Sequence, residues 1–473
     1  MSEQHPETTR ACQRRDIGEQ MRALASGETT SEALVRQAIR DNDINARHNI
    51  FITPPGEIAL SEARARDAER SRGELRGALH GVPLVVKDNI HVAGLPCTAG
   101  TATLQDFRPT EDAVAVARLR AAGAVILGKT NMHELAYGIT SDNLTFGAVA
   151  NGLDPECFAG GSSGGSAVAV ALGIAAAGLG TDTGGSSRIP AALNGIAGFR
   201  PGIGRYPNDG LVMISQTRDT VGPMANSVAD LITLDQIVAK EPYTARPAAL
   251  RGLRLAVPRE PFYVDLEPSV SQCMDGVLAA LADAGVELLE APMPLLQGLN
   301  DRTGFPLVLY ETAVLLRAYL RRYQPQLTLE ALVDGVRSPD VSEIMQGVVG
   351  GAIPESVYLA ARDIYRPALQ QVYRDYFAQH DVDAIVFPTV PLTARPIAGS
   401  RETVTLGDRQ LPTFPTYIRN TDPGSNAGIP GLTLPAGLSE EGRAIGVELD
   451  GPEGSDTRLL EIGLALEALL KTR

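Results

Sequence analysis

Two short segments of the chain are rich in glycine and serine and could support hydrolytic chemistry. The first is GGSSGGS, residues 160–166, and the second is GTDTGGSSR, residues 180–188. Residues 160–204 hold 13 glycines in 45 positions, so the backbone there must make unusual turns or approach another group closely. Taken singly, each loop is better explained by tight turns. Together, with a lysine upstream, they favour a catalytic site.

One serine of each loop could meet the other. Ser162 and Ser186 are 24 positions apart, and the small-residue segment between them is expected to form a helix of about ten to twelve residues. The chain can then fold back and bring the serines together. The N–H groups of Gly184, Gly185 and Ser186 have little side-chain cover, which suits an oxyanion. A following helix over residues 187–193 would add its positive dipole end.

Lys87 is the candidate base. It ends an apolar run, residues 82–86, and precedes Asp88 and Asn89. A lysine at the end of a buried strand is partly desolvated, which lowers its pKa from a reference of about 10.4. Only the neutral amine can accept a proton. Taken alone, Lys87 is better explained as a surface side chain that snorkels from the strand end, so its assignment depends on the serine loops.

Four segments together resemble the amidase signature family: GVPLVVKDN, GKTNMHELAYG, GGSSGGSA and GLGTDTGGSSRIPAALNGIAGFRP. The match extends over roughly residues 16–240, and NTDPGSNAGIPGLTLPAG near the C-terminus is also family-like. Residues 215–231, SQTRDTVGPMANSVADL, are similar to the indoleacetamide and mandelamide hydrolase branch. The resemblance implies an α/β fold: a large mixed central β-sheet, helices on both faces and a helical insertion near the active site.

The resemblance also implies roles for the loop residues. Ser186 is the nucleophile, Ser162 the bridging serine after a cis peptide bond, and Lys87 the base. The backbone N–H groups that form the oxyanion hole are those of Thr183, Gly184, Gly185 and Ser186.

Further residues of the family pattern are expected to support this site. Ser163, Asp182 and Arg188 belong to the hydrogen-bond network, and Tyr137 lines the acyl pocket. The insertion offers more candidates for the pocket or for ordinary core packing: Phe305, Leu309, Tyr310 and Tyr319.

Two positions depart from the family pattern. Ala159 stands where many members have proline, and Ser187 stands where an apolar residue or threonine is common. Neither position belongs to the Lys87–Ser162–Ser186 triad that the resemblance implies.

The implied reaction cleaves the C–N bond of a small carboxylic amide, expected to be an aryl or arylalkyl primary amide. Neutral Lys87 takes a proton from Ser162, which takes one from Ser186, and Ser186 attacks the carbonyl. Ammonia leaves, and water hydrolyses the acyl-enzyme on Ser186. The reaction needs no metal and no cofactor, and the histidines are too scattered along the chain for a metal site.

Other interpretations fit parts of the pattern. Residues 161–165 formally match the GxSxG elbow of α/β-hydrolases, but the downstream His380 precedes a strand instead of following the last one. A phosphate loop would need a lysine where Ser166 stands. A carbamate or ester hydrolase with the same triad, the amidase subunit of a tRNA-dependent amidotransferase complex, and an inactive scaffold stay open as alternatives.

Composition limits the possible partners. The chain has 473 residues and a formal net charge of −14, without the basic face that nucleic acid would favour. The N-terminal MSEQHPETTR has no apolar core, so no signal peptide is expected. The longest apolar stretch, near residues 167–179, is too short and glycine-rich for a membrane span. We expect no nucleic-acid or membrane partner, and a homodimer stays open.

The cysteines indicate the compartment. Cys12, Cys97, Cys157 and Cys273 are widely spaced and form no CxxC pair, which fits a reducing environment better than a disulfide framework. We therefore expect a cytoplasmic protein.

The elements that must position the site follow from hydrophobic periodicity. Residues 1–75 are expected to form a helical N-terminal arm, with Thr30 as a helix cap. In the signature core, residues 76–240, strands alternate with helices, which argues for a βαβ core with a mostly parallel sheet. Residues 300–380 form a helical, cap-like insertion. All of these belong to a single domain, residues 1–473.

Overall fold

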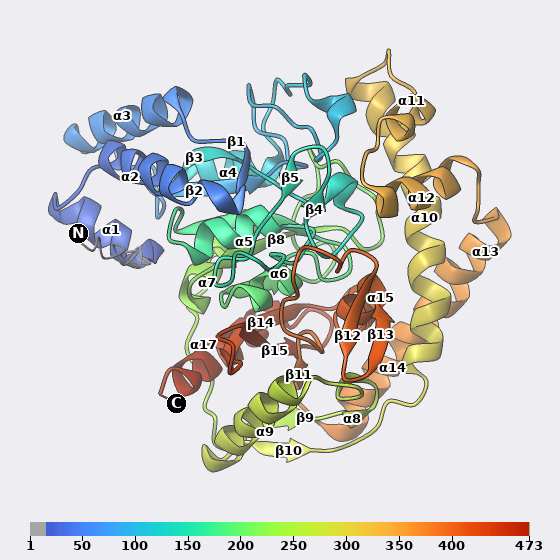
Figure 1. Ribbon diagram of the computed structural model, residues 1–473. Coiled ribbons are helices and arrows are strands. Elements are labelled where there is room, and N and C mark those ends of the chain that lie inside the picture. Colours follow the sequence, from blue (N-terminus) through green and yellow to red (C-terminus); the bar gives the residue numbers. More distant parts are fainter. Residues whose placement is uncertain (1–15, 473) are drawn as a thin grey trace, which may run out of the picture.

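The computed structural model describes residues 16–472, so the first part of the predicted N-terminal arm and Cys12 lie outside the described residues. An 11-stranded sheet runs through the molecule from β1 at one edge to β10 at the other (Figure 1). In spatial order its strands are β1 (Phe51–Thr53), β3 (Val125–Thr130), β2 (Pro83–Lys87), β6 (Ala177–Asp182), β8 (Thr220–Ala225), β7 (Ala197–Arg200), β14 (Gly431–Leu438), β15 (Ala444–Asp450), β11 (Ala384–Pro388), β9 (Arg254–Ala256) and β10 (Glu287–Leu289).

The sheet is mixed, as expected, but it is not mostly parallel. The parallel pairs are β2–β3 and β2–β6 near one edge and β11–β9 and β9–β10 at the other. The remaining six pairs are antiparallel. Helix–strand alternation correctly indicated the parallel ends. The central strands lack such crossovers, and antiparallel neighbours do not need them: β14 and β15 form a hairpin.

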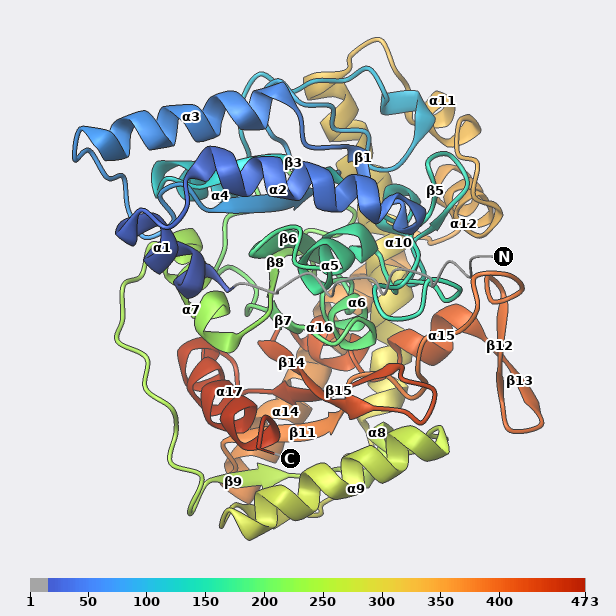
Figure 2. The ribbon, with the colours of Figure 1, turned by 60° about the vertical axis from the view of Figure 1, so that its left-hand side comes forward.

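Helices cover both faces of the sheet (Figures 1 and 2). On one face the largest apolar core packs beneath α4 (Val114–Ala121), α7 (Val228–Ala239), α9 (Pro268–Asp283) and α17 (Asp456–Leu470). The opposite face is covered by α2 (Ser31–Ile44), α3 (Glu57–Ser71), α5 (Gly164–Ala171) and α6 (Arg188–Leu193). Because α5 and α6 adjoin the two glycine-rich loops, this second face carries the candidate site.

The described part of the N-terminal arm is helical. It consists of α1 (Ile17–Ser26), α2 and α3 on the outside of the molecule (Figure 2). The helices α2 and α3 lie near the β1 edge, whereas α1 lies beside α7, where the N–H of Ile17 donates to Oδ1 of Asp230 at 3.1 Å. Thr30 caps α2 by accepting a hydrogen bond from the N–H of Ala33, as its position in the sequence indicates. Asp16 and Glu19 form a capping box at the start of α1.

Along the chain, a group of helices follows β10 and precedes β11; it lies on the right-hand side of Figure 1. It comprises α10 (Leu296–Tyr323), α11 (Leu329–Asp334), α12 (Pro339–Val349), α13 (Glu355–Ala360), a π-helical turn (Ala361–Tyr365) and α14 (Arg366–His380). The remaining strands and α-helices are β4 (Asp142–Asn143), β5 (Gly147–Ala148), α8 (Arg259–Phe262), β12 (Thr403–Leu406), β13 (Arg409–Pro412), α15 (Thr413–Ile418) and α16 (Asp422–Ala427). Short 3₁₀ turns cover Ala46–His48, Ala102–Leu104 and Glu134–Ala136.

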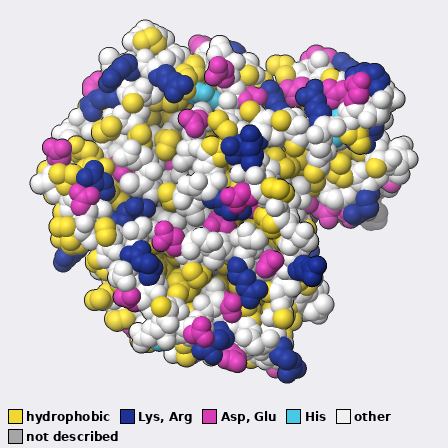
Figure 3. Space-filling model, turned by 180° about the vertical axis from the view of Figure 1, so that it is seen from behind, with side chains coloured by type: hydrophobic (Ala, Val, Ile, Leu, Met, Phe, Trp, Pro, Cys, Tyr) yellow, Lys and Arg dark blue, Asp and Glu magenta, His cyan; other side chains and the backbone are white. Residues whose placement is uncertain are grey.

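The surface shows mixed charge. On the face drawn in Figure 3, Lys and Arg side chains are interspersed with Asp and Glu side chains. Within residues 16–472, no helix combines the length and the apolar character needed to cross a membrane.

Gly123 gives a test of how tightly the strand that carries Lys87 is packed. Its φ is 97°, and a Cβ there would lie 2.5 Å from the Cα of His80, just before β2. We expect Gly123→Ala to lower the free energy of unfolding by about 2–5 kcal/mol, because a left-handed residue and an overpacked contact each destabilise. Chemical denaturation measures this.

Gly73→Ala is the matched control. Its φ is 74°, but a Cβ there would meet nothing within 4 Å. It should therefore destabilise by only about 1 kcal/mol, the cost of the left-handed conformation. Equal losses in the two variants would contradict the tight contact between Gly123 and His80.

Candidate active site

Lys87 lies at the end of β2 and its side chain is fully buried. Its Nζ donates a hydrogen bond to Oγ of Ser162 at 2.7 Å and another to Oγ1 of Thr181 at 2.8 Å. Nδ2 of Asn89 also donates to the Thr181 hydroxyl, at 3.1 Å. The amine is thus held between hydroxyl groups, and no carboxylate of residues 16–472 is paired with it.

Burial sets the protonation state of this amine. Desolvation lowers the pKa of Lys87 from its ordinary value to about 7, although the negative charges of Asp182 and Asp219 oppose the shift. A substantial neutral fraction therefore exists near neutral pH. In that state the amine can accept a proton from the Ser162 hydroxyl.

Ser162 follows a cis peptide bond with Gly161, and its side chain is fully buried. Its carbonyl accepts a hydrogen bond from the N–H of His133 at 3.1 Å. Ala159, which stands where many family members have proline, donates its N–H to the carbonyl of Val149 at 3.1 Å. Proline has no N–H and could not make this bond.

The segment between the two serines differs from the expected single helix. The helix α5 covers only Gly164–Ala171, the left-handed Gly173 follows it, and residues 177–182 form β6. The sequence pattern missed this strand because its residues are small. Small residues are needed here: a Cβ at Gly180 would lie 2.6 Å from Oγ of Ser163.

Ser186 lies between β6 and α6 and borders a cavity, with 8 % of its surface exposed. The N–H of Ser163 donates to the Ser186 carbonyl at 3.1 Å, which holds the two loops together. Among the described residues, Oγ of Ser186 has no hydrogen-bond partner. The structure therefore brings Lys87, Ser162 and Ser186 to one site, but only Lys87 and Ser162 are joined by a side-chain hydrogen bond.

The four N–H groups expected to form the oxyanion hole are not equivalent. The N–H of Gly185 donates to Oδ1 of Asp182 at 2.8 Å and is occupied. Within residues 16–472, the N–H groups of Thr183, Gly184 and Ser186 have no acceptor. Three of the four expected donors are thus available to a ligand. The N–H of Gly185 is not available, because the carboxylate of Asp182, three residues earlier in the chain, accepts its hydrogen bond.

Asp182 organises the second loop from within. Its carboxylate also accepts hydrogen bonds from the N–H of Ser187, at 3.2 Å, and from Nε of Arg188, at 3.1 Å. Nη1 of Arg200 donates to it at 3.0 Å. Burial alone would raise the pKa of Asp182, but the guanidinium groups of Arg188 and Arg200 hold it well below its usual range. Asp182 is therefore a buried, fully compensated anion.

The other supporting residues lie around this anion. Arg188 is fully buried and reaches β15, where its Nη1 donates to Oε1 of Glu448 at 2.8 Å. Oγ of Ser163 donates to the carbonyl of Thr181 at 3.2 Å. The departure at Ser187 is accommodated, because its hydroxyl donates to the carbonyl of Gly222 at 3.2 Å.

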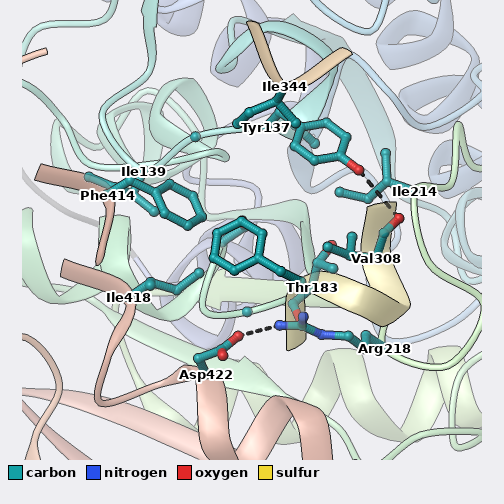
Figure 4. A pocket seen from close by; sticks show the side chains of 15 residues that line it. Tyr137, Ile139, Thr183, Ile214, Arg218, Val308, Ile344, Phe414, Ile418 and Asp422 are labelled. Carbon is teal, nitrogen blue, oxygen red and sulfur yellow. Dashed lines mark hydrogen bonds and ion pairs between the residues drawn. The ribbon is translucent and has the colours of Figure 1, made fainter. Parts of the chain in front are cut away.

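An apolar cavity opens in front of Ser186 (Figure 4). The side chains that give it this character are those of Ala136, Tyr137, Ile139, Ile214, Phe305, Val308, Ile344, Phe414 and Ile418. The ring of Tyr137 lines the cavity and its hydroxyl donates to the carbonyl of Val308 at 3.4 Å (Figure 4). The same hydroxyl is hydrogen-bonded to Oγ1 of Thr312 on α10. The rings of Phe305 and Phe414 have centroids 5.9 Å apart. The cavity suits an aromatic or branched apolar group next to a reacting carbonyl.

Only one of the four insertion residues named from the sequence reaches the cavity. Phe305 borders it, whereas Tyr310 stacks on Tyr358. Tyr319 packs with His91, whose Nε2 lies 2.7 Å from its hydroxyl. Leu309 is partly buried and packs against the apolar cluster that includes residues of α10, α11 and α12.

Sequence reasoning missed several residues of the cavity. Ile344, Phe414 and Ile418 come from α12 and α15, which no motif marked. Arg218 and Asp422 form a charged pair at the cavity wall. Both lie inside family-like segments, so those segments were the available signal. Within the described chain, no group of three or more His, Cys, Asp or Glu side chains is arranged to hold a metal ion.

Comparisons with known proteins agree with this geometry. The family model described as Amidase matches residues 28–460. The indoleacetamide hydrolase of Agrobacterium vitis is 43% identical over 411 residues, which cover 87% of this chain and 88% of the relative. The mandelamide hydrolase of Pseudomonas putida is 40% identical, covering 89% of this chain and 85% of the relative.

A solved structure described as an amidase is also similar. It superposes with a TM-score of 0.86 at 38% sequence identity, covering 96% of this chain and 99% of that chain. The expected fold and family are thereby confirmed: the chain belongs to the amidase signature family and is an enzyme that hydrolyses amide C–N bonds.

Proposed function

We propose that this enzyme hydrolyses aryl or arylalkyl primary amides through an acyl-enzyme on Ser186, with Ser162 as proton relay and Lys87 as base. The observation that carries the proposal is the buried Lys87–Ser162 hydrogen bond of 2.7 Å, made by an amine with a pKa of about 7. A buried lysine of this kind is suited to general-base chemistry near neutral pH.

Acylation begins with Ser186 facing the substrate carbonyl. The proposed relay requires Oγ of Ser186 to turn toward Oγ of Ser162, and the bond from the Ser163 N–H to the Ser186 carbonyl holds the two loops together. Neutral Lys87 accepts the Ser162 proton while Ser162 accepts the Ser186 proton, and Oγ of Ser186 attacks the carbonyl carbon. The developing oxyanion is stabilised by the free N–H groups of Thr183, Gly184 and Ser186. Gly185 has no part in this revised set of donors.

Collapse of the tetrahedral intermediate completes the half-reaction. The proton on Lys87 returns through Ser162 to the leaving nitrogen, and ammonia departs with it. Water then attacks the Ser186 ester and gives one proton to the same relay, which returns it to Oγ of Ser186 as the ester bond breaks. The acid product loses its remaining proton to solvent and leaves as a carboxylate, with Ser186, Ser162 and neutral Lys87 restored.

The cavity supports an aromatic acyl group. Its wall is largely apolar and includes the rings of Tyr137, Phe305 and Phe414. The two relatives described above are named for indoleacetamide and mandelamide, which are primary amides with an aromatic ring near the carbonyl. Burial of such a ring would contribute binding energy that a small aliphatic amide lacks.

Removing each member of the triad tests the assignment. We expect Ser186→Ala, Ser162→Ala and Lys87→Met each to lower kcat for phenylacetamide by about 10³-fold or more, since residues that act as one unit fail together. Ammonia release measures the rate, and circular dichroism checks folding. Ser71→Ala, an exposed serine on α3, is the control and should match the unaltered enzyme. Near-normal turnover in a triad variant would remove that residue from the mechanism.

The pH dependence tests the protonation state of Lys87. Its pKa is lowered to about 7 and the base must be neutral, so kcat/KM should rise with pH through about 7 and level off above it. Below this pKa the rate should fall about tenfold per pH unit. A profile that stays flat from pH 5 to pH 9 would contradict the role of Lys87.

The aromatic wall is tested by substrate discrimination. We expect Phe414→Ala to lower kcat/KM for phenylacetamide about tenfold or more, while kcat/KM for propionamide changes little because that acyl group does not reach the ring. Val314→Ala on α10 is the control, since Val314 is 55% exposed and lies outside the cavity. Equal losses for both amides would indicate that Phe414 does not select the acyl group.

A further inference from the structure

The candidate oxyanion donors are held from their carbonyl sides. In a trans peptide unit the N–H and the preceding C=O point in opposite directions. The N–H of Thr183 therefore shares a unit with the carbonyl of Asp182, and the N–H of Gly184 shares one with the carbonyl of Thr183. Whatever binds those two carbonyls fixes the direction of the two N–H groups.

Two arginines occupy those carbonyls. Nη1 of Arg200 donates to the carbonyl of Asp182 at 2.6 Å. Nε of Arg218 donates to the carbonyl of Thr183 at 3.2 Å. Each guanidinium thus lies behind one free N–H. A cation at the carbonyl oxygen also polarises the peptide unit and strengthens its N–H as a donor.

Arg218 is itself fixed in place. It is only 4% exposed, its Nη1 donates to the carbonyl of Gly304 on α10 at 3.2 Å, and its Nη2 is paired with Oδ1 of Asp422. Oδ2 of Asp422 in turn accepts hydrogen bonds from Asn300 and Asn426, both at 3.0 Å. The guanidinium therefore has little freedom to reorient.

Asp219, which follows Arg218 in the chain, binds the side chain of Thr183. Oγ1 of Thr183 donates to Oδ1 of Asp219 at 2.6 Å. The Arg218–Asp422 pair also packs directly against the loop: a Cβ at Gly184 would lie 3.0 Å from Nη2 of Arg218 and 3.1 Å from Oδ1 of Asp422. Figure 4 shows this ion pair at the cavity wall beside Thr183. The peptide unit between Thr183 and Gly184 is thus immobilised from behind.

We propose that Arg218 is a positioning residue for the oxyanion hole: by binding the carbonyl of Thr183 it aims and polarises the N–H of Gly184 at the developing negative charge. The proposal rests on the oxyanion donors proposed above. It assigns Arg218 an effect on the transition state and not on binding of the aromatic group.

A pair of inhibitors separates these two effects. 2-Phenylethylboronic acid can form a tetrahedral adduct with Ser186 that places an oxygen in the oxyanion hole, whereas 2-phenylethanol carries the same aryl group without such an adduct. We expect Arg218→Met to lower kcat for phenylacetamide about 10–100-fold, less than or comparable to loss of one oxyanion donor. The boronic acid should bind more weakly by a similar factor, and the Ki of 2-phenylethanol should change by less than about threefold.

Thr421→Val is the matched control. Oγ1 of Thr421 donates to the carbonyl of Gly184 at 2.6 Å, but the N–H of that peptide unit belongs to Gly185 and faces Asp182. This variant should leave the ratio of the two inhibition constants unchanged. Arg218→Lys, which keeps a single cationic donor, should recover part of the lost kcat and serves as the second variant if Arg218→Met does not fold.

Several results would overturn the proposal. These are an unchanged kcat in both Arg218 variants, an equal weakening of the two inhibitors, or a change in KM alone. Ser186→Ala separates this failure from failure of the proposed function. If Ser186→Ala still turns over phenylacetamide, the acyl-enzyme mechanism is wrong. If it is inactive while the Arg218 variants keep their kcat, only the role of Arg218 is wrong.

Discussion

Desolvation of one amine is the constraint on which the site depends. Lys87 is fully buried at the end of a strand with buried neighbours at every position. Only a dry site moves its pKa to about 7, and only a rigid one keeps Nζ within 2.7 Å of Ser162. Both conditions require packing from all sides. The helix α5 supplies it above the sheet, and small residues in β6 let that helix approach.

The second glycine-rich loop, residues 180–188, obeys a related constraint. It must hold its backbone N–H groups in a fixed direction toward the substrate. The chain achieves this by fixing the other side of each peptide unit. Asp182 binds the N–H of Gly185 and Ser187, which leaves neighbouring N–H groups free. Since Asp182 is a buried charge, it needs compensation, and Arg188 and Arg200 provide it. Arg188 extends this network to Glu448 on β15, so the C-terminal strands are part of the site's support.

How much could be predicted from the sequence depended on the range of the interaction. Local features were predicted well: the Thr30 cap, the strand ending at Lys87 and the helix after Ser187 follow from neighbouring residues. The mixed central sheet was predicted from the resemblance to the amidase signature family. The central antiparallel pairs and the strand over residues 177–182 were missed, because small buried residues carry no clear periodicity. Cavity residues such as Ile344 and Phe414 were missed because only tertiary packing brings them to Ser186.

The charges around Asp182 and the protonation of Lys87 are coupled. The negative charges of Asp182 and Asp219 both favour the protonated form of the Lys87 amine. If Asp182 stood unpaired in this dry site, its attraction for a proton on Lys87 would be strong. Arg188 and Arg200 place positive charge on the same carboxylate and so weaken that attraction. The two arginines therefore do more than hold the loop: by compensating Asp182 they oppose a charge that favours the protonated form of Lys87.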